Sequence, residues 1–242
     1  MNLIIDIGNT SAKLAAFENG ELKEIIRCSN QTLEGWDALC KKYSFRKGII
    51  SSVVTLNDEI RNTIERLPFP VMEFTHRTPI PIRNLYKTPE TLGMDRLAAV
   101  IAAYSMKPSH PILVIDAGTC ITYDFIDEQG NYHGGNISPG MEMRFQALHE
   151  FTSKLPKISA EGELPSFGQS TETAIRSGVI RGIEYEISGH IGHLEKKYSQ
   201  LLVFLTGGNE FSFETNLKSG IFADVFLVLK GLNRILEYNE TL

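Results

Sequence analysis

Residues 3–10 read LIIDIGNT, and residues 113–119 read LVIDAGT. Each stretch is an apolar run typical of a buried strand, followed by an aspartate, a glycine two residues later and then a threonine. The two aspartates, Asp6 and Asp116, are separated by a domain-sized stretch of chain. Such a repeat indicates two related halves, with equivalent turns that face each other across a cleft.

The residue types of this repeat suit phosphate binding. Glycine lets the backbone approach a bulky anion closely, and neighbouring amides and a threonine or asparagine side chain can donate hydrogen bonds to it. An aspartate repels phosphate, but it can hold a cation that bridges to the phosphates. One Asp-x-Gly turn alone is common and uninformative. Two copies, each after a buried strand, favour a clamp for a nucleoside triphosphate and its metal.

Along the rest of the chain, segments with the hydrophobic pattern of strands alternate with segments that have the pattern of helices, which is typical of an α/β fold. A hairpin is expected around Asn19 and Gly20, because both residues tolerate positive φ. A turn cluster is expected at 134–140 and a loop at 153–168. Strands are expected at 3–7, 12–17, 22–27, 48–54, 112–115, 121–126 and 201–205, and helices near 36–43, 60–67, 92–104, 140–151, 171–198 and 224–238.

Composition excludes several classes of protein. The chain has 242 residues, 42% of them hydrophobic, which suffices for the core of one or two domains. A net charge of −5 disfavours nucleic acid as a partner. Three cysteines without a CxxC pair argue against a disulfide scaffold or zinc ribbon. No apolar run is long enough to span a bilayer and no signal peptide is evident, so we expect a cytoplasmic protein without membrane association.

Residues 6–13, DIGNTSAK, resemble the first phosphate-binding motif of the type III pantothenate kinases, within the acetate and sugar kinase/heat-shock ATPase/actin superfamily. Further blocks fit the family in order: YxxPxxLGxDR at 86–96, DAGT at 116–119, GGxIxPG at 134–140, GxST at 168–171 and TGG at 206–208. Together they extend over most of the chain. The resemblance implies an α/β fold of two ribonuclease H-like (actin-like) domains, 1–110 and 111–242. Each would be a mixed β-sheet flanked by helices, with a cleft between the domains.

The resemblance also implies an activity: transfer of the ATP γ-phosphate to the primary hydroxyl of pantothenate, giving 4'-phosphopantothenate in the first step of coenzyme A synthesis. It implies a homodimer that requires potassium or ammonium. Asp95 would accept the proton, and Asp116 would coordinate the monovalent cation. Cys120 stands where the family often has alanine, and both side chains are small.

The remaining roles are carried over by position. The residues expected to bind ATP are Asp6, Ile7, Gly8, Asn9, Thr10, Ser11, Ala12, Lys13 and Thr119, with Asp6 also near the ATP-bound magnesium. The residues expected to bind pantothenate are Tyr86, Gly93, Met94, Asp95, Arg96 and Thr171.

Elementary chemistry agrees with the roles of Asp95 and Arg96. Both fall in the first turn of the expected helix 92–104, where exposed amides favour an anion. A guanidinium can grip a carboxylate, and pantothenate has one. Taken alone, Asp95 could merely cap the helix and Arg96 could be a solvated charge. Tyr86 could be a packing aromatic, and Thr171 could be a helix N-cap.

Three other features have plainer interpretations. The TGG at 206–208 could approach a nucleotide or be an ordinary turn after a strand. His190 and His193 share a helix face, but no third metal ligand is evident, which favours a partly exposed helix face. Glu142 and Arg144 read as solvated charges.

Two other functions remain open. The same fold could phosphorylate a sugar, acetate or another small alcohol or acid. The chain could instead be a non-catalytic transcription accessory factor. The presence of Asp6, Asp95 and Asp116 and the negative net charge both argue against that second alternative.

Overall fold

The computed structural model describes residues 1–208 and 220–242. The chain forms two compact units. The first unit contains residues 1–109, 126–134 and 226–242, and the second contains 110–125 and 135–225. These units differ in two segments from the expected domains 1–110 and 111–242, whose boundary stays a prediction. No helix in the described ranges has the length and hydropathy needed to cross a bilayer.

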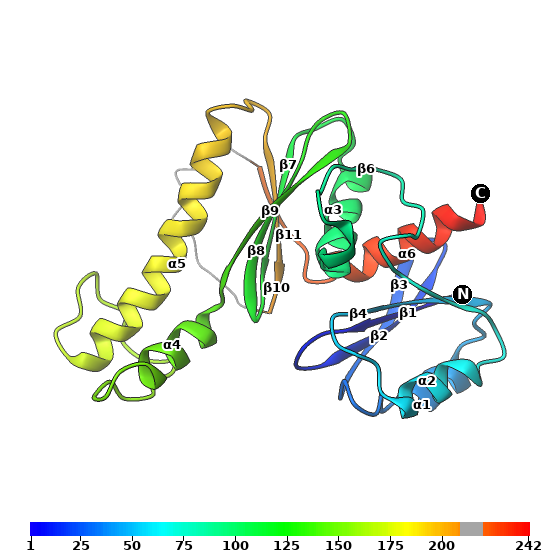
Figure 1. Ribbon diagram of the computed structural model, residues 1–242, viewed down its shortest axis with the longest axis horizontal. Coiled ribbons are helices and arrows are strands. Elements are labelled where there is room, and N and C mark those ends of the chain that lie inside the picture. Colours follow the sequence, from blue (N-terminus) through cyan, green and yellow to red (C-terminus); the bar gives the residue numbers. More distant parts are fainter. Residues whose placement is uncertain (209–219) are drawn as a thin grey trace. The chain divides into compact units, whose positions relative to one another are not determined.

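The first unit is built on a five-stranded sheet in the order β3-β2-β1-β4-β5. Its strands are β1 (Asn2–Ile7), β2 (Ala12–Glu18), β3 (Glu21–Cys28), β4 (Lys47–Ser52) and β5 (Val71–Glu73). Its helices are α1 (Trp36–Lys42), α2 (Asp58–Glu65), α3 (Met94–Met106) and α6 (Leu227–Glu240), with a short 3-10 turn at Pro89–Thr91. The sheet is mixed, because β1 pairs antiparallel with β2 and parallel with β4. Helices α1 and α2 cover one of its faces (Figure 1).

Alternation along β1 determines which side chains reach the other face. Leu3, Ile5 and Ile7 are buried with residues of α1 and α2. Asp6 therefore points to the opposite face, the one that α6 contacts along β1 and β4. Helices α3 and α6 pack together closely at Gly231, where a Cβ would lie 1.9 Å from the carbonyl oxygen of Ala98. Asp6 thus lies on the sheet face that carries α3 and α6.

The second sheet has six strands in the order β11-β10-β7-β8-β9-β6. They are β6 (Arg83–Asn84), β7 (Ile112–Ala117), β8 (Cys120–Ile126), β9 (Asn131–Pro139), β10 (Leu202–Gly207) and β11 (Gly220–Ala223). Helices α4 (Met141–Glu150) and α5 (Thr171–Glu195) belong to the same unit as most of these strands. They share a core with β7, β8 and β10, which includes Phe145, Ile183, Ile121 and Val203.

The expected turn cluster at 134–140 is wrong, because most of it belongs to strand β9. Gly135 in particular serves close packing within the sheet rather than a reversal of the chain. A Cβ on Gly135 would lie 1.9 Å from the carbonyl oxygen of Tyr123 in β8. The short strands β5, β6 and β11 were not expected either, and β6 exists only through its pairing with β9.

Candidate active site

The turn between β1 and β2 follows Asp6 directly. The backbone N–H of Gly8 donates to the carbonyl oxygen of Ser11 at 3.0 Å, which closes the turn. Asp6 and Lys13 are register partners across the two strands, and Lys13 Nζ lies 4.0 Å from Asp6 Oδ2. The turn therefore places a carboxylate and an ammonium group beside a glycine whose backbone a ligand can approach.

Asn30 supports this turn from outside the motif. Its side-chain amide donates to the carbonyl oxygens of Gly8, at 3.0 Å, and Asn9, at 2.9 Å. No local sequence signal identifies Asn30, because the contact depends on how β3 leaves the sheet. It is a residue that sequence reasoning missed, and its two hydrogen bonds fix the backbone of the predicted phosphate-binding motif.

Asp6 has an unusual electrostatic environment. It is only 9% exposed, and burial raises the pKa of its carboxyl from the ordinary 3.8 to about 6. The positive charge of Lys13 lowers this pKa, and the negative charge of Asp95 raises it. Asp95 therefore lies near enough to Asp6 for the two charges to interact, so the first unit gathers two carboxylates and a lysine.

Asp95 occupies the first turn of α3, as expected. Gly93 is the N-cap in an extended conformation, and Asp95 Oδ1 accepts a hydrogen bond from the Arg96 N–H at 2.8 Å. A Cβ on Gly93 would lie only 2.6 Å from Asp95 Oδ1. The glycine thus leaves room for the carboxylate in this position.

Arg96 is buried, with 8% of its surface exposed, so its interpretation as a solvated charge is wrong. Its guanidinium carbon lies 5.9 Å from the ring centroid of Tyr86, within cation–π range. The Tyr86 ring stacks on Tyr132, with centroids 6.4 Å apart. Gly134, with φ at +96°, makes room for this arrangement, because a Cβ there would lie 2.8 Å from Tyr86 Cδ2. The side chains of Arg96, Tyr86 and Tyr132 are therefore in contact one after another, with the Tyr86 ring in the middle.

The second copy of the repeat also has a turn between two strands, in the second unit. The N–H of Gly118 donates to the Cys120 carbonyl oxygen at 3.0 Å, which makes a tighter turn than the one that Gly8 closes with Ser11. Behind the turn, the N–H of Gly140 donates to the carbonyl oxygen of Thr119 at 3.1 Å. A Cβ on Gly140 would lie 2.3 Å from that oxygen. That the two turns of the repeat face each other stays a prediction.

The TGG block ends β10 next to the same turn. Thr206 is the register partner of Asp116, and Gly207 is the partner of Ala117. Gly207 has φ at +106°, and a Cβ there would lie 2.5 Å from the backbone of Ala117. This glycine is thus required by packing against β7. A role toward a nucleotide stays a prediction.

Thr171 is not the N-cap of α5. Ser170 is, and its side chain forms a capping box with Thr173. Thr171 instead lines a cavity of about 880 Å³ between α4 and α5, whose walls are largely apolar and include Leu148 and Val179. Its hydroxyl is therefore not used for capping.

Arg144 belongs to a charge network, which corrects its interpretation as a solvated charge. It donates to Glu186 at 2.6 Å, to Ser138 at 2.8 Å and to the carbonyl oxygen of Pro139 at 2.8 Å. Glu186 also accepts from the Tyr123 hydroxyl at 2.8 Å. Burial acts to raise the pKa of Glu186, but its hydrogen bonds outweigh that effect and lower it. This network fixes the end of β9 to α4 and α5.

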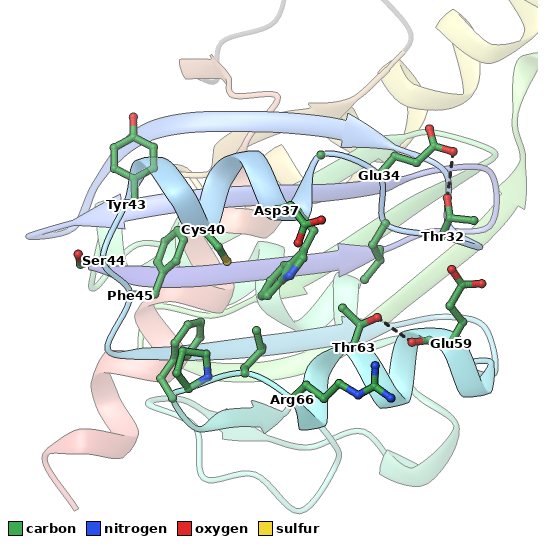
Figure 2. A pocket seen from close by; sticks show the side chains of 16 residues that line it. Thr32, Glu34, Asp37, Cys40, Tyr43, Ser44, Phe45, Glu59, Thr63 and Arg66 are labelled. Atoms are coloured by element: carbon green, nitrogen blue, oxygen red, sulfur yellow. Dashed lines mark hydrogen bonds between the residues drawn. The ribbon is translucent and has the colours of Figure 1, made fainter.

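A cavity of about 800 Å³ lies between α1 and α2 (Figure 2). Figure 2 shows Tyr43 and Phe45 near the end of α1, and Glu59, Thr63 and Arg66 on the side of α2. The cavity is on the α1 and α2 side of the first sheet, whereas Asp6 points to the opposite face. None of the expected site residues lines it.

Comparison with known proteins agrees with this architecture. A ROK family glucokinase from Streptomyces griseus, solved with glucose and AMPPNP, matches with a TM-score of 0.52 at 11% identity, over 96% of this chain and 97% of that one. A conserved Campylobacter jejuni protein, described as belonging to the Baf family of transcriptional activators, matches with a TM-score of 0.60 at 22% identity, over 99% and 100% of the two chains. The chain therefore has the fold of this glucokinase, a mixed α/β fold with two sheets flanked by helices, as expected.

Sequence comparison narrows the class. The family model described as type III pantothenate kinase matches residues 2–193. The type III pantothenate kinase of Phocaeicola vulgatus is 67% identical over all of both chains, and that of Bacteroides fragilis is 59% identical over 99% of each. The chain belongs to the type III pantothenate kinase family.

Proposed function

We propose that this chain transfers the γ-phosphate of ATP to the primary hydroxyl of pantothenate, giving 4'-phosphopantothenate and ADP in the first step of coenzyme A biosynthesis. Family membership supports this activity. The structural observation that carries the proposal is that Asp6, at the end of β1, lies near Asp95, in the first turn of α3. One carboxylate is at the phosphate motif, and the other lies within electrostatic range of it.

Asp95 is the proton acceptor in this proposal. As the hydroxyl oxygen of pantothenate bonds to the γ-phosphorus, its proton passes to the Asp95 carboxylate, and the bond from that phosphorus to the bridging oxygen breaks. ADP leaves with the electron pair. Because transition states of phosphoryl transfer are usually loose, positioning and charge stabilisation contribute more than base strength.

In this proposal, residues 6–13 bind the ATP phosphates, and Thr119 contacts ATP. The donors present fit a divalent metal, because a buried carboxylate oxygen at Asp6 is the kind of ligand that magnesium prefers. Magnesium bound with ATP would neutralise phosphate charge and orient the γ-phosphate. Lys13 adds a positive charge at the same point. Asp116, in the second unit, would coordinate potassium or ammonium.

Arg96 is the group best suited to the pantothenate carboxylate. Its guanidinium is buried and oriented by the Tyr86 ring, so little conformational freedom remains to be lost on binding. Gly93 and Met94 in the first unit, and Thr171 in the second, are also proposed to bind pantothenate. We further propose a cytoplasmic homodimer with no nucleic acid partner.

A panel of acceptors tests this proposal. The purified protein is incubated with ATP, magnesium, potassium and, separately, pantothenate, glucose, acetate and glycerol, and products are identified by mass spectrometry. Phosphopantothenate as the predominant product supports the proposal. A predominant sugar or acetyl phosphate would contradict the acceptor, and DNA binding without any phosphoryl transfer would contradict the activity.

A further inference from the structure

Ser51 lies beside the proposed magnesium-binding aspartate. It is in β4, which pairs parallel with β1, and its register partner is Asp6. Register partners in a parallel pair project from the same face of the sheet, and their strands are roughly 4.8 Å apart. The Ser51 hydroxyl and the Asp6 carboxylate therefore point into the same space, on the face that carries α3 and α6.

The Ser51 hydroxyl is buried and has no partner in the described part of the chain. The residue is 1% exposed, and its Oγ makes no hydrogen bond. Its neighbour Ser52 differs, because its Oγ donates to the Val54 carbonyl oxygen at 2.7 Å. Buried hydroxyls are nearly always hydrogen-bonded, so a buried hydroxyl without a protein partner, beside a proposed ligand site, is a candidate to contact that ligand.

The repeat provides a second observation. In the second unit, Thr206 in β10 is the register partner of Asp116 in β7. β10 is parallel to β7, as β4 is to β1, and Thr206 is also buried. Each aspartate of the repeat thus has a buried hydroxyl residue beside it on the adjacent parallel strand. Sheet packing alone favours apolar side chains at such positions.

We propose that Ser51 is a positioning residue for the metal of the MgATP complex, and that its hydroxyl holds a water molecule bound to that ion. Magnesium usually keeps several of its waters in proteins, and groups that hold such waters tune metal affinity. Asp6 supplies the charge, and Ser51 orients the hydration shell. This inference rests on the proposed function and deepens it.

The test compares Ser51→Ala with the matched control Ser52→Ala. Affinity for the non-hydrolysable analogue AMPPNP is measured by calorimetry, once with magnesium and once with EDTA. Ser51→Ala is expected to reduce the enhancement of affinity by magnesium about tenfold, with metal-free affinity unchanged. Ser52→Ala is expected to leave that enhancement at the wild-type value.

Thermal unfolding without nucleotide or metal separates this role from a structural one. Ser51→Ala should unfold at the wild-type temperature or higher, because it removes an unpaired buried hydroxyl, whereas Ser52→Ala should unfold at a lower temperature. This inference would be overturned if magnesium raised the AMPPNP affinity of Ser51→Ala as much as that of the wild type, or if the variant lost equal affinity with and without metal. Neither result would affect the proposed function. A wild-type protein that binds no AMPPNP would contradict the proposed function itself.

Discussion

Asp95 lies close enough to Asp6 for its negative charge to raise the pKa of the Asp6 carboxyl. The two residues are 89 positions apart in sequence, and the packing of α3 on the face of the first sheet brings them together. One follows a strand in the phosphate motif and the other begins a helix. Because the two carboxylates have different roles, we expect different effects when each is replaced.

Replacing Asp95 with asparagine should lower kcat by at least about 100-fold, because the side chain can no longer accept the hydroxyl proton. Affinity for AMPPNP and the unfolding temperature should change little. The comparison is made by steady-state kinetics and calorimetry on the same preparations. A variant with wild-type kcat would refute the assignment of Asp95 as the proton acceptor.

Replacing Asp6 with asparagine should stabilise the protein in EDTA at pH 7 while destroying its activity. The folded protein holds a proton on Asp6 up to about pH 6, against an ordinary pKa of 3.8. This group's contribution to stability is therefore present below about pH 4 and lost as the pH rises to about 6. The difference between the two pKa values corresponds to about 3 kcal/mol at pH 7.

Urea unfolding at several pH values measures this effect. The wild-type protein should lose stability relative to Asp6→Asn between pH 4 and 6, and the gap should stay constant above that range. A variant less stable than wild type at pH 7 would show that burial of the Asp6 carboxylate carries no such cost.

Arg96→Lys should raise the KM for pantothenate by about tenfold or more and leave the KM for ATP unchanged. Lysine keeps the charge but loses the planar fork that binds a carboxylate through two hydrogen bonds, and it stacks poorly on Tyr86. Initial rates over a matrix of both substrates give the two constants. Equal increases in both would point to a general disturbance of α3 instead.

Gly140→Ala should lower the free energy of unfolding by about 1–3 kcal/mol, because the new methyl group would overlap the carbonyl oxygens of Gly118 and Thr119. Gly189→Ala in α5 is the matched control. Nothing lies within 4 Å of its Cβ position, so it should stabilise the helix by about 0.5–1 kcal/mol. Chemical denaturation of both variants checks the contrast. A Gly140→Ala variant as stable as wild type would contradict the close packing behind the second turn.

The repeated strand, aspartate and glycine pattern was sufficient to predict β1, β7 and the turns that follow them. Local periodicity determines these features. In both turns the glycine N–H donates to a backbone carbonyl oxygen, but the turn at Gly118 is shorter than the turn at Gly8. The same reasoning failed at 134–140, where most of the segment is strand β9 and Gly135 packs closely against β8. Sequence alone does not distinguish a glycine needed for space from one needed for a positive φ.

The supporting residues of the site could not be predicted, because each depends on contacts between distant segments. The role proposed for Ser51 depends on its position opposite Asp6 in the pairing of β4 with β1. The network that joins the end of β9 to α4 and α5 likewise depends on a contact between Arg144 and Glu186, which are 42 positions apart. Asn30 reaches back 22 positions to Gly8. Motifs identified the groups proposed for the reaction, whereas the groups that hold them in place became visible only with the fold.

The rate of 4'-phosphopantothenate formation from pantothenate and γ-labelled ATP tests the central claim most directly. Phosphoryl transfer to pantothenate by the wild-type protein is predicted to be rapid with potassium or ammonium and much slower when sodium replaces them. Folded protein that binds ATP and yet moves no label to pantothenate in the presence of potassium would contradict the account.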